Sequence, residues 1–308
     1  MISFLQGDVF DKLKELDDNS IDCVVTSPPY WGLRDYGVLG QLGLEPTYQE
    51  HIQNIVKLFR VMKPKLKDSA TVWLNYGDSY AATINGTKAK DVLNDDRAFR
   101  DKPFSTIQGS IKPKDLVMIP NRIAIALQDD GWWIRSEIIW HKPNPMPEST
   151  KDRPTSCHEK IWLITKSKKY YYDADAIREP VAQGTITRLS EKNLKNQKGS
   201  TRGNGGMKPN GNMKAVGNME TKNKRNVWTI TTKPCKEAHF ATFPKDLIEP
   251  CIKAGCPEGG VVLDPFGGSG TTGIVAKQFN RTAILIELNP SYIEIAKKRI
   301  DKELGMFK

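Results

Sequence analysis

The sequence predicts a doubly wound α/β fold, in which helices cover both faces of a largely parallel sheet. The chain opens with an apolar strand at residues 2–6, a helix-spaced apolar pattern from Val9 to Leu16, and a second apolar strand, Ile21–Val25. Near the other end, the apolar run Val261–Leu263 leads through a glycine-rich loop into another helical pattern. Strand–helix–strand units of this kind form right-handed crossovers and align their strand ends at one edge of the sheet. Ligands bind at that edge in doubly wound folds, so we expect the functional site there.

A rigid corner follows the strand Ile21–Val25. Residues 26–31 have the sequence Thr-Ser-Pro-Pro-Tyr-Trp, and the two prolines fix φ and remove backbone donors. The residue before a proline is held extended, which orients Ser27. The corner therefore offers a hydroxyl, proline carbonyl oxygens and the flat ring of Tyr30, a set that suits a planar substrate carrying an amine. The alternative is a strand that ends in a simple Pro-Pro turn with its aromatic residues in the core.

The middle of the chain continues the alternation of strands and helices. Apolar residues at positions 52, 55, 56, 58, 59 and 62 lie on one helical face, and Pro64 closes that helix. Pro120 marks either the first turn or a break of the next helix. Residues 83–112 are polar and lack periodicity, which predicts a surface insertion. The expected elements are a loop Gly32–Leu44, a helix Glu45–Met62, a strand Ala70–Asn75, a helix Asp115–Asp129, and strands Trp132–Trp140 and Lys160–Tyr172.

The glycine-rich loop near the end of the chain has the features of a ligand site. Residues 264–272 have the sequence Asp-Pro-Phe-Gly-Gly-Ser-Gly-Thr-Thr, and the predicted helix Thr271–Phe279 begins within them. Free N–H groups at a helix N-terminus attract an anion such as a carboxylate. The next strand leads to Glu287, at a place where a carboxylate can bind ribose hydroxyls. Asn289 is expected to cap the last helix, with Pro290 in its first turn.

Together the two motifs resemble motif IV and motif I of the amino-methylating DNA methyltransferases that use S-adenosylmethionine. The catalytic motif precedes the cofactor motif, an order that resembles the β group of that family. The resemblance extends from residue 1 to about residue 300, with a gap near 184–226. It implies a Rossmann-like sheet, mostly parallel with an antiparallel strand, plus a basic DNA-recognition insertion. It divides the chain into a catalytic part at 1–183, the insertion at 184–226 and a cofactor-binding part at 227–308.

Two other enzyme classes share single features with the chain. The glycines match a dinucleotide-binding pattern, but the pattern alone is weak, and the Ser-Pro-Pro-Tyr and Asp-Pro-Phe segments have no use in the hydride transfer of an oxidoreductase. A carbon-5 cytosine methyltransferase needs a cysteine nucleophile. That family places its Pro-Cys pair after the cofactor loop, whereas Cys235 and Cys251 lie before it. A further alternative is a non-catalytic DNA-binding protein that retains the fold. The intact catalytic and cofactor motifs argue against it.

Residues 184–226 differ in composition from the rest of the chain. They contain ten Lys or Arg, two Glu, seven Gly and eight Asn. A segment with so little apolar surface cannot fold alone. We interpret it as a basic loop that contacts DNA phosphates and becomes ordered on binding; a disordered linker is the alternative. A short strand, Val227–Thr231, and a helix, Lys245–Ala254, are expected after it.

The resemblance also implies a role for individual residues. Asp8 would bond the cofactor adenine, although it is equally placed to cap the first helix. Thr242 and Phe243 would line the methionine end of the cofactor pocket; a helix cap and a core aromatic are the alternative. Asp264 would bond the cofactor amino group and suit its sulfonium charge. The expected catalytic residues are Ser27, Pro28, Pro29 and Tyr30; the expected cofactor-binding residues are Asp8, Thr242, Phe243, Asp264, Phe266, Gly268, Gly270, Thr271 and Glu287; the expected DNA-binding residues are Trp31, Arg34, Lys195, Lys198, Arg202, Lys222, Lys224 and Arg225.

The residue before Pro-Pro-Tyr indicates which base is modified. In the family, Ser at this position goes mostly with cytosine, and Asp or Asn goes with adenine. Ser27 therefore predicts N4-methylcytosine, with N6-methyladenine as the alternative. Double-stranded DNA is the expected partner. A homodimer and a cognate restriction endonuclease are compatible with the resemblance.

The overall composition agrees with these expectations. The 308 residues carry a net charge of +10 and a pI of about 9.2, which favours an anionic partner. The chain has five cysteines and no CxxC pair, and its first residues do not resemble a secretory signal peptide. These features predict reduced thiols in a cytoplasmic protein. Cys157-His158 lacks further ligands at metal-site spacing, so no metal is expected. No apolar run is long enough to span a membrane.

Overall fold

The computed structural model describes residues 1–82, 103–190, 220–232 and 243–305 of the chain. The chain divides into two compact units, one of Met1–Asp173 with Asn226–Lys308 and one of Ala174–Arg225. The first unit holds the large sheet and both sequence motifs. The second unit overlaps the segment whose composition differs from that of the rest of the chain.

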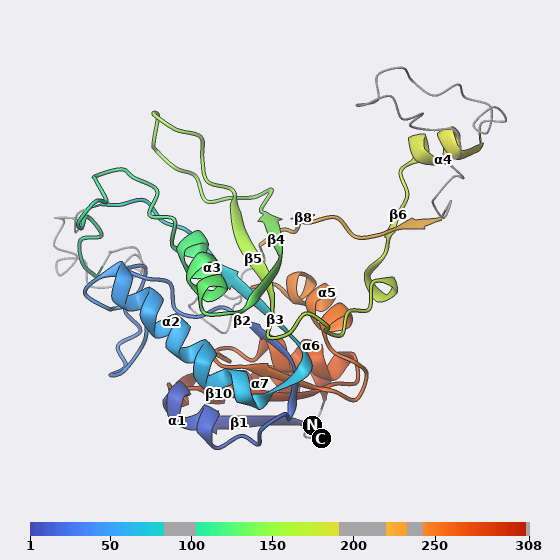
Figure 1. Cartoon of the computed structure of the whole chain (residues 1–308), viewed down its shortest axis with the longest axis horizontal. Helices are drawn as coiled ribbons and strands as arrows, with labels where there is room; N and C mark the ends of the chain where they lie inside the picture. Colours follow the sequence, from blue (N-terminus) through green and yellow to red (C-terminus); the bar gives the residue numbers. More distant parts are fainter. Residues whose placement is uncertain (83–102, 191–219, 233–242, 306–308) are drawn as a thin grey trace. The chain divides into compact units, whose positions relative to one another are not determined.

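An eight-stranded mixed sheet forms the centre of the first unit (Figure 1). Its strand order is β1-β10-β9-β2-β3-β5-β4-β8. The strands from β1 to β3 pair in parallel, whereas β5 runs antiparallel to both β3 and β4. The predicted sheet, mostly parallel with an antiparallel strand, is therefore confirmed. The strands are β1 Ile2–Gln6, β2 Ile21–Thr26, β3 Leu66–Tyr76, β4 Trp133–His141, β5 His158–Thr165, β8 Val227–Thr229, β9 Val261–Asp264 and β10 Thr282–Glu287.

Helices cover both faces of this sheet (Figure 1): α1, α2 and α3 pack along one face, and α5, α6 and α7 along the other. Asp8, Thr47 and Asn289 cap α1, α2 and α7 by accepting hydrogen bonds from the first turn. Within the described ranges, no helix is long and apolar enough to cross a membrane. The helices are α1 Val9–Lys14, α2 Tyr48–Met62 with the 3₁₀ turn Lys63–Lys65, α3 Ile119–Asp129, α5 Lys245–Gly255, α6 Thr271–Gln278 and α7 Pro290–Leu304.

The parallel neighbours β2 and β9 form the switch point of the sheet, where the connections lead away in opposite directions. From β2 the chain continues through α2 to β3 on one side, and from β9 it continues through α6 to β10 on the other. A side-chain hydrogen bond joins the two halves, because Thr26 Oγ1 donates to Asp264 Oδ1 at 2.7 Å. Ligands bind at such a switch point in doubly wound folds. The Ser-Pro-Pro-Tyr corner and the glycine loop thus leave the sheet at neighbouring strand ends.

Strand β2 is apolar along its length because both of its faces are covered. Ile21, Cys23 and Val24 are fully buried. Val24 belongs to the core cluster that includes Phe59 and Met62 of α2. Neighbouring residues of a strand point to opposite faces, so Cys23 fills the other side of the sheet. A central parallel strand therefore shows a continuous apolar run rather than an alternating one.

Several predicted elements have different ends in the structure; for example, α2 begins at Tyr48 rather than Glu45, and β3 begins at Leu66 rather than Ala70. Helix α3 begins at Ile119 rather than Asp115, because Leu116 pairs with Tyr80 in a β-bridge and Met118 adopts a left-handed φ of 62°. Pro120 lies in the first turn of α3 and does not break the helix, which is one of the two alternatives that the sequence left open. Strand β5 ends at Thr165 rather than residue 172, since Thr165 Oγ1 donates to the Ser167 carbonyl in a turn.

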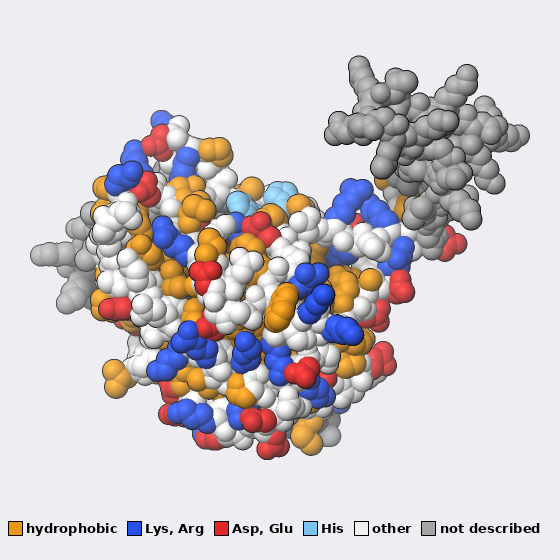
Figure 2. Space-filling view, in the orientation of Figure 1, with side chains coloured by type: hydrophobic (Ala, Val, Ile, Leu, Met, Phe, Trp, Pro, Cys, Tyr) orange, Lys and Arg blue, Asp and Glu red, His pale blue; other side chains and the backbone are white. Residues whose placement is uncertain are grey.

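Charged side chains on the first unit are of mixed sign. In the view of Figure 2, Lys and Arg side chains are spread over the surface with acidic side chains between them. Several of them form ion pairs, such as Arg60 with Asp130 and Lys65 with Asp18. Exposed pairs of this kind add little stability. They also neutralise part of the positive charge locally, so net charge alone does not locate a DNA-binding face.

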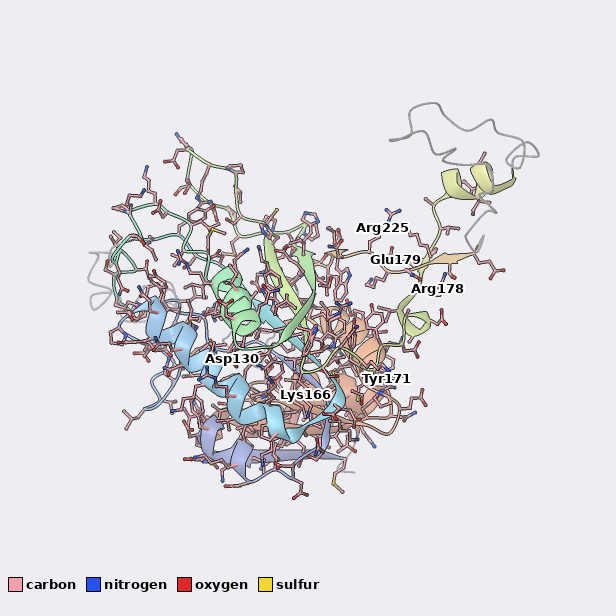
Figure 3. All side chains as sticks on the ribbon, in the orientation of Figure 1. Asp130, Lys166, Tyr171, Arg178, Glu179 and Arg225 are labelled. Atoms are coloured by element: carbon pink, nitrogen blue, oxygen red, sulfur yellow. The ribbon has the colours of Figure 1, made fainter. Side chains whose placement is uncertain are left out.

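The second unit contains a small antiparallel pair, β6 Glu179–Pro180 with β7 Thr221–Lys222, and the helix α4 Gln183–Ser190. Arg178 holds the pair together by donating to Thr221 and to Asn223 Oδ1. The Arg225 amide donates to Glu179, and Figure 3 labels these residues around the pair. The described ends of 184–226 are ordered through Arg178 and β6, which lie outside that segment. The prediction that the segment cannot fold alone therefore stays a prediction. Residues 191–219 lie outside the described part.

Candidate active site

A cavity of about 650 Å³ lies at the switch point of the sheet and takes its lining from both sequence motifs. It is bounded by the ends of β1, β2, β9 and β10, the loop that follows β2, and the facing ends of β4 and β5. The structure thus brings together segments that are far apart in the sequence. Of the predicted site residues, it is lined by Asp8, Ser27, Pro28, Pro29, Tyr30, Arg34, Phe243, Asp264, Phe266, Gly268, Thr271 and Glu287.

The Tyr30 ring is fixed against a second aromatic ring. Its centroid lies 4.4 Å from that of Tyr76, with an angle of 27° between the ring planes. Ser27 Oγ donates a hydrogen bond of 3.2 Å to the Tyr30 hydroxyl. The serine proton therefore points toward the tyrosine, which leaves the Ser27 lone pairs for a ligand amine. The corner is a preorganised platform rather than a flexible turn.

The floor of the cavity contains polar residues that the sequence did not indicate. The Tyr30 hydroxyl donates to Glu159 Oε2 at 2.9 Å, and Asn75 Nδ2 donates to the same oxygen at 3.1 Å. Lys142 forms an ion pair with the other oxygen of Glu159. Burial, and next the charge of Glu159, raise the pKa of Tyr30 well above its ordinary value. Tyr30 is consequently a neutral phenol at physiological pH.

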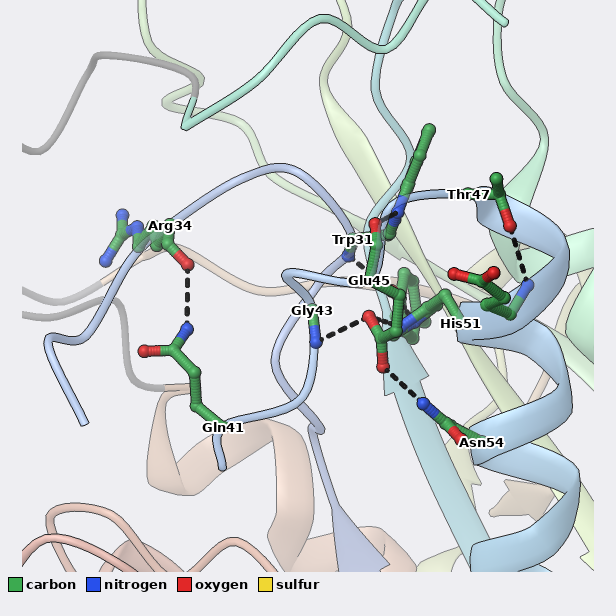
Figure 4. Close-up of polar contacts among 10 residues, drawn as sticks. Trp31, Arg34, Gln41, Gly43, Glu45, Thr47, His51 and Asn54 are labelled. Carbon is green, nitrogen blue, oxygen red and sulfur yellow. Dashed lines mark hydrogen bonds and ion pairs between the residues drawn. The ribbon is translucent and has the colours of Figure 1, made fainter. Parts of the chain in front are cut away.

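A buried hydrogen-bond chain holds the corner in place (Figure 4). Glu45 Oε2 lies 2.8 Å from His51 Nδ1, and His51 Nε2 lies 2.7 Å from the Tyr76 hydroxyl. The Tyr76 hydroxyl accepts the Trp31 backbone N–H at 2.8 Å. Glu45 also accepts from the Gly43 amide at 2.9 Å. Helix α2 therefore anchors both ends of the loop that follows the corner.

The prediction that Trp31 contacts DNA is not supported by its position. Its side chain is only 2% exposed. Its ring packs against Tyr48 and Phe104, and its indole N–H donates to the Glu45 carbonyl at 2.9 Å. An aromatic residue with one polar group is well suited to such a partly polar core site. The core alternative stated for the corner aromatics is correct for Trp31.

Asp264 is a buried carboxylate whose oxygens are already used by the protein. Oδ1 accepts from Thr26 Oγ1 at 2.7 Å and from the Phe266 amide at 3.1 Å, and Oδ2 accepts from Thr272 Oγ1 at 2.6 Å. Burial raises its pKa from 3.8 to about 6. Asp264 therefore braces β2, β9 and α6 together. It contributes a negative charge to the cavity wall at neutral pH.

Glu287 shapes the glycine loop from the end of β10. Its Oε2 accepts the Gly268 amide at 2.9 Å and its Oε1 accepts the Asn289 amide at 2.8 Å. Burial raises the pKa of the Glu287 carboxyl above its ordinary value. A carboxylate has about four acceptor sites, so Glu287 can still bind hydroxyl groups of a ligand. A Cβ added to Gly268 would meet only the Phe266 carbonyl oxygen, at 3.8 Å, which leaves open space beside the carboxylate.

Asp8 and Gly270 combine structural roles with their position beside the site. Asp8 accepts the Phe10 amide at 2.8 Å as the cap of α1 and also lines the cavity, so both interpretations of this residue agree with the geometry. Gly270 has a φ of 77° and precedes the first turn of α6. An L-residue is strained there, and a Cβ would meet Ala296 at 3.0 Å. The position therefore requires glycine for the turn itself.

The described residues that were predicted to bind DNA belong to both units of the chain. Arg34 lines the cavity, and its backbone carbonyl accepts from Gln41 Nε2 at 3.2 Å (Figure 4). Lys222 belongs to the second unit, where it pairs with Glu179 at 3.9 Å. Among the described residues, no group of His, Cys, Asp and Glu is arranged to hold a metal ion. The second unit also contains Lys224 and Arg225. The structure does not describe the predicted DNA-binding residues Lys195, Lys198 and Arg202, or the predicted cofactor-binding residue Thr242.

Known proteins resemble the chain in both sequence and fold. A family model described as DNA methylase matches residues 21–298. The type II methyltransferase M.Cfr9I of Citrobacter freundii is 45% identical over 301 residues, which cover 98% of this chain and 88% of the relative. M.SmaI of Serratia marcescens is 45% identical over 294 residues, covering 96% and 89%.

Two solved structures share the fold at low sequence identity. The PvuII DNA methyltransferase, described as cytosine-N4-specific, superposes with a TM-score of 0.63 at 19% identity and covers 99% of this chain and 91% of its own. TTHA0409 of Thermus thermophilus, determined in complex with S-adenosyl-L-methionine, has a TM-score of 0.60 at 21% identity and covers 100% and 98%. Both likenesses concern the arrangement of the sheet and helices.

Proposed function

Because the chain belongs to the DNA methylase family and is a type II DNA methyltransferase of the N4/N6 group, we propose that it methylates N4 of cytosine in double-stranded DNA. The observation that carries the proposal is the placement of Ser27 and Pro28 in one cavity with Asp264 and Glu287. The first pair suits an exocyclic amine, and the second suits a cationic donor with ribose hydroxyls.

S-adenosyl-L-methionine is the methyl donor that fits these residues, and when bound it supplies an electrophilic methyl group on a sulfonium. The charge of Asp264 complements a cation, and Glu287 retains acceptor capacity for ribose hydroxyls. Phe243, Phe266 and Tyr292 add aromatic surface to the cavity wall for a nucleoside base. TTHA0409, which has the same fold, binds this donor, and this supports the assignment.

The target amine is a poor nucleophile because its lone pair is delocalised into the base. A base inside a stacked duplex must first be flipped into the pocket. Stacking on an aromatic ring such as that of Tyr30 contributes about 1–3 kcal/mol per base. The Ser27 hydroxyl and the Pro28 carbonyl would accept the two amine hydrogens and favour a tetrahedral nitrogen. The same oxygens stabilise the positive charge that develops on that nitrogen.

Ser27 also supports cytosine over adenine as the target. The family resemblance associates Ser before Pro-Pro-Tyr mostly with cytosine, and PvuII methyltransferase, which shares the fold, is described as cytosine-N4-specific. Adenine N6 is the second candidate, since both bases present an amine beside a ring nitrogen. A homodimer, a cognate restriction endonuclease and a cytoplasmic location stay predictions.

The product of the reaction tests the proposal directly. Purified protein would be incubated with unmethylated genomic DNA and S-adenosyl-L-methionine, and the DNA digested to nucleosides for mass spectrometry. We expect N4-methylcytosine. N6-methyladenine would contradict the cytosine assignment while keeping the family and donor. A parallel reaction without the donor controls for methylated bases already present in the DNA.

Gly77→Ala is expected to slow methyl transfer at least tenfold while the protein still folds. A Cβ at this position would lie 2.8 Å from Tyr30 Cε2 and 3.2 Å from Glu159 Cδ. Both side chains must then shift, and misplacement by about 1 Å can cost 10²-fold in rate. Single-turnover methylation measures the effect. Ser20→Ala is the control, because its hydroxyl bonds to the Asp17 carbonyl at the exposed surface; equal rates in the two variants would contradict the prediction.

A further inference from the structure

We propose that Ser27, Tyr30 and Glu159 form a proton relay that removes the proton released by the amine during methyl transfer. Glu159 is the terminal acceptor and acts through Tyr30 and Ser27 without touching the base. The inference rests on the proposed amine methylation but applies equally to cytosine N4 and adenine N6. It assigns a function to a carboxylate on the cavity floor that the sequence motifs do not include.

The hydrogen bonds run in one direction from the amine site to the carboxylate. Ser27 Oγ donates to the Tyr30 hydroxyl at 3.2 Å, and that hydroxyl donates to Glu159 Oε2 at 2.9 Å. The phenol also lies 3.3 Å from Asn75 Oδ1, a longer contact than the one to Glu159. Tyr30 has a single proton, which therefore goes to the carboxylate. Ser27 is left with its lone pairs directed away from Tyr30, where an amine can donate to them.

Three donors hold Glu159 as an ionised acceptor. Lys142 Nζ pairs with Oε1, and Asn75 Nδ2 and the Tyr30 hydroxyl both donate to Oε2. A carboxylate that receives only donors is in its charged form, because a protonated acid would place its own donor against one of them. The side chains of Glu159 and Lys142 are 18% and 19% exposed. Proton uptake by Glu159 removes the negative charge that pairs with Lys142. Glu159 therefore has to release the proton again before the next reaction.

The surroundings keep the relay atoms aligned. Tyr76 stacks on the Tyr30 ring, and Gly77 lies so close that a Cβ would clash with Tyr30 and press on Glu159. Burial raises the pKa of Tyr30 well above its ordinary value. A phenol that resists ionisation passes a proton on only as it receives another. This suits a concerted relay rather than a tyrosinate intermediate.

The proposed step balances in atoms and charge. The amine nitrogen forms a bond to the methyl carbon as the carbon–sulfur bond breaks, and the electron pair remains on sulfur. The nitrogen then carries one proton too many and gives it to Ser27 Oγ. The Ser27 proton moves to the Tyr30 oxygen and the Tyr30 proton moves to Glu159. Serine and tyrosine end neutral as they began, and Glu159 returns its proton to water after the base leaves.

The test compares single-turnover methylation rates of the full-length protein in H₂O and D₂O. We expect Tyr30→Phe and Glu159→Gln each to lower the rate roughly tenfold to a hundredfold, within the range of general acid–base catalysis. We expect the wild-type solvent isotope effect to disappear in both variants. Because the two residues act in one chain, the double variant should be no slower than the slower single variant. Tyr30→Phe keeps the ring and the Glu159–Lys142 pair, so it tests the relay even if Glu159→Gln folds poorly.

Matched controls separate the relay from general damage. Tyr170→Phe removes a hydroxyl that accepts a hydrogen bond from Arg135 at the surface. Glu294→Gln neutralises an exposed carboxylate that is paired with Lys297. Both should keep the wild-type rate and isotope effect. Affinity for S-adenosyl-L-methionine, measured by calorimetry, should stay within about twofold in the relay variants, since neither side chain braces the glycine loop.

Three results would overturn the relay. They are a wild-type rate in Glu159→Gln, an isotope effect that persists in both single variants, or rate losses that multiply in the double variant. Mass spectrometry of the wild-type product in the same reactions keeps the two proposals apart. A methylated cytosine with no effect of the variants rejects the relay alone. Methylated adenine with the expected effects rejects only the cytosine assignment.

Discussion

Ser27→Ala is expected to lower the single-turnover rate of methyl transfer about 10²- to 10³-fold, the usual loss when one preorganised charge-stabilising group is removed. The hydroxyl lines the cavity and donates its proton to Tyr30, which leaves acceptor lone pairs for the amine. Alanine cannot accept an amine hydrogen, so developing charge on the nitrogen loses one of its two stabilising oxygens. The rate at saturating donor and DNA is the quantity to measure.

The Ser27→Ala effect should be confined to the chemical step. Binding of the donor and of DNA should change little, because the hydroxyl is directed at the reacting amine. Ser20→Ala is a matched control, as its hydroxyl donates at the exposed surface to the Asp17 carbonyl at 2.7 Å. A variant at position 27 that retains more than a tenth of the wild-type rate would show that Ser27 does not activate the amine.

Asp264→Ala is expected to lower the free energy of unfolding by about 3 kcal/mol or more and to abolish donor binding. The substitution leaves the hydroxyls of Thr26 and Thr272 and the Phe266 amide without their buried acceptor. Each unsatisfied buried group costs about 1–3 kcal/mol. The glycine loop would also lose the contact that holds its first residues. Urea unfolding and calorimetric titration with S-adenosyl-L-methionine measure the two effects.

Asp264→Asn provides the control, since hydroxyl groups can turn to satisfy an amide. Burial raises the pKa of Asp264 from 3.8 to about 6, so the folded state binds this proton more tightly than the unfolded state. Its contribution to stability is therefore highest below about pH 4 and falls as the pH rises through about 6. Between pH 4 and pH 7 the wild type should lose on the order of 3 kcal/mol relative to Asp264→Asn. A stability difference that stays constant across this range would contradict the raised pKa of Asp264. An Asp264→Ala variant as stable as the wild type would contradict the bracing role.

The sequence predicted the sheet well because its strands carry their own signals. The apolar runs in β2 and β9, the glycine loop and the Asn289-Pro290 start of α7 are local patterns with one physical explanation each. These patterns were enough to predict a functional site at the aligned ends of the parallel strands, where the cavity lies.

The residues that sequence analysis missed depend on pairing between distant segments. Glu159 reaches the cavity floor because β5 runs antiparallel to β4, which sets it opposite Trp140 and near Lys142. Neither its residue type nor its neighbours identify that register. A carboxylate at the start of the strand after the proline loop, with a lysine just before that loop, is the faint signal available. The burial of Trp31 depends in the same way on distant residues, because its ring packs against Phe104 and Tyr48.

The hydrogen bond between Thr26 and Asp264 also has a consequence for biosynthesis. It joins residues 238 positions apart, so a ribosome that adds about 5–20 residues per second completes β2 long before β9 exists. During that interval β2 lacks β9, one of its two parallel neighbours, and an apolar strand with an open edge is prone to self-association. The nascent chain carries the Ser-Pro-Pro-Tyr corner throughout this time, but its cavity has no wall on the β9 side. Translation that stops early should therefore yield aggregation-prone fragments without methylating activity.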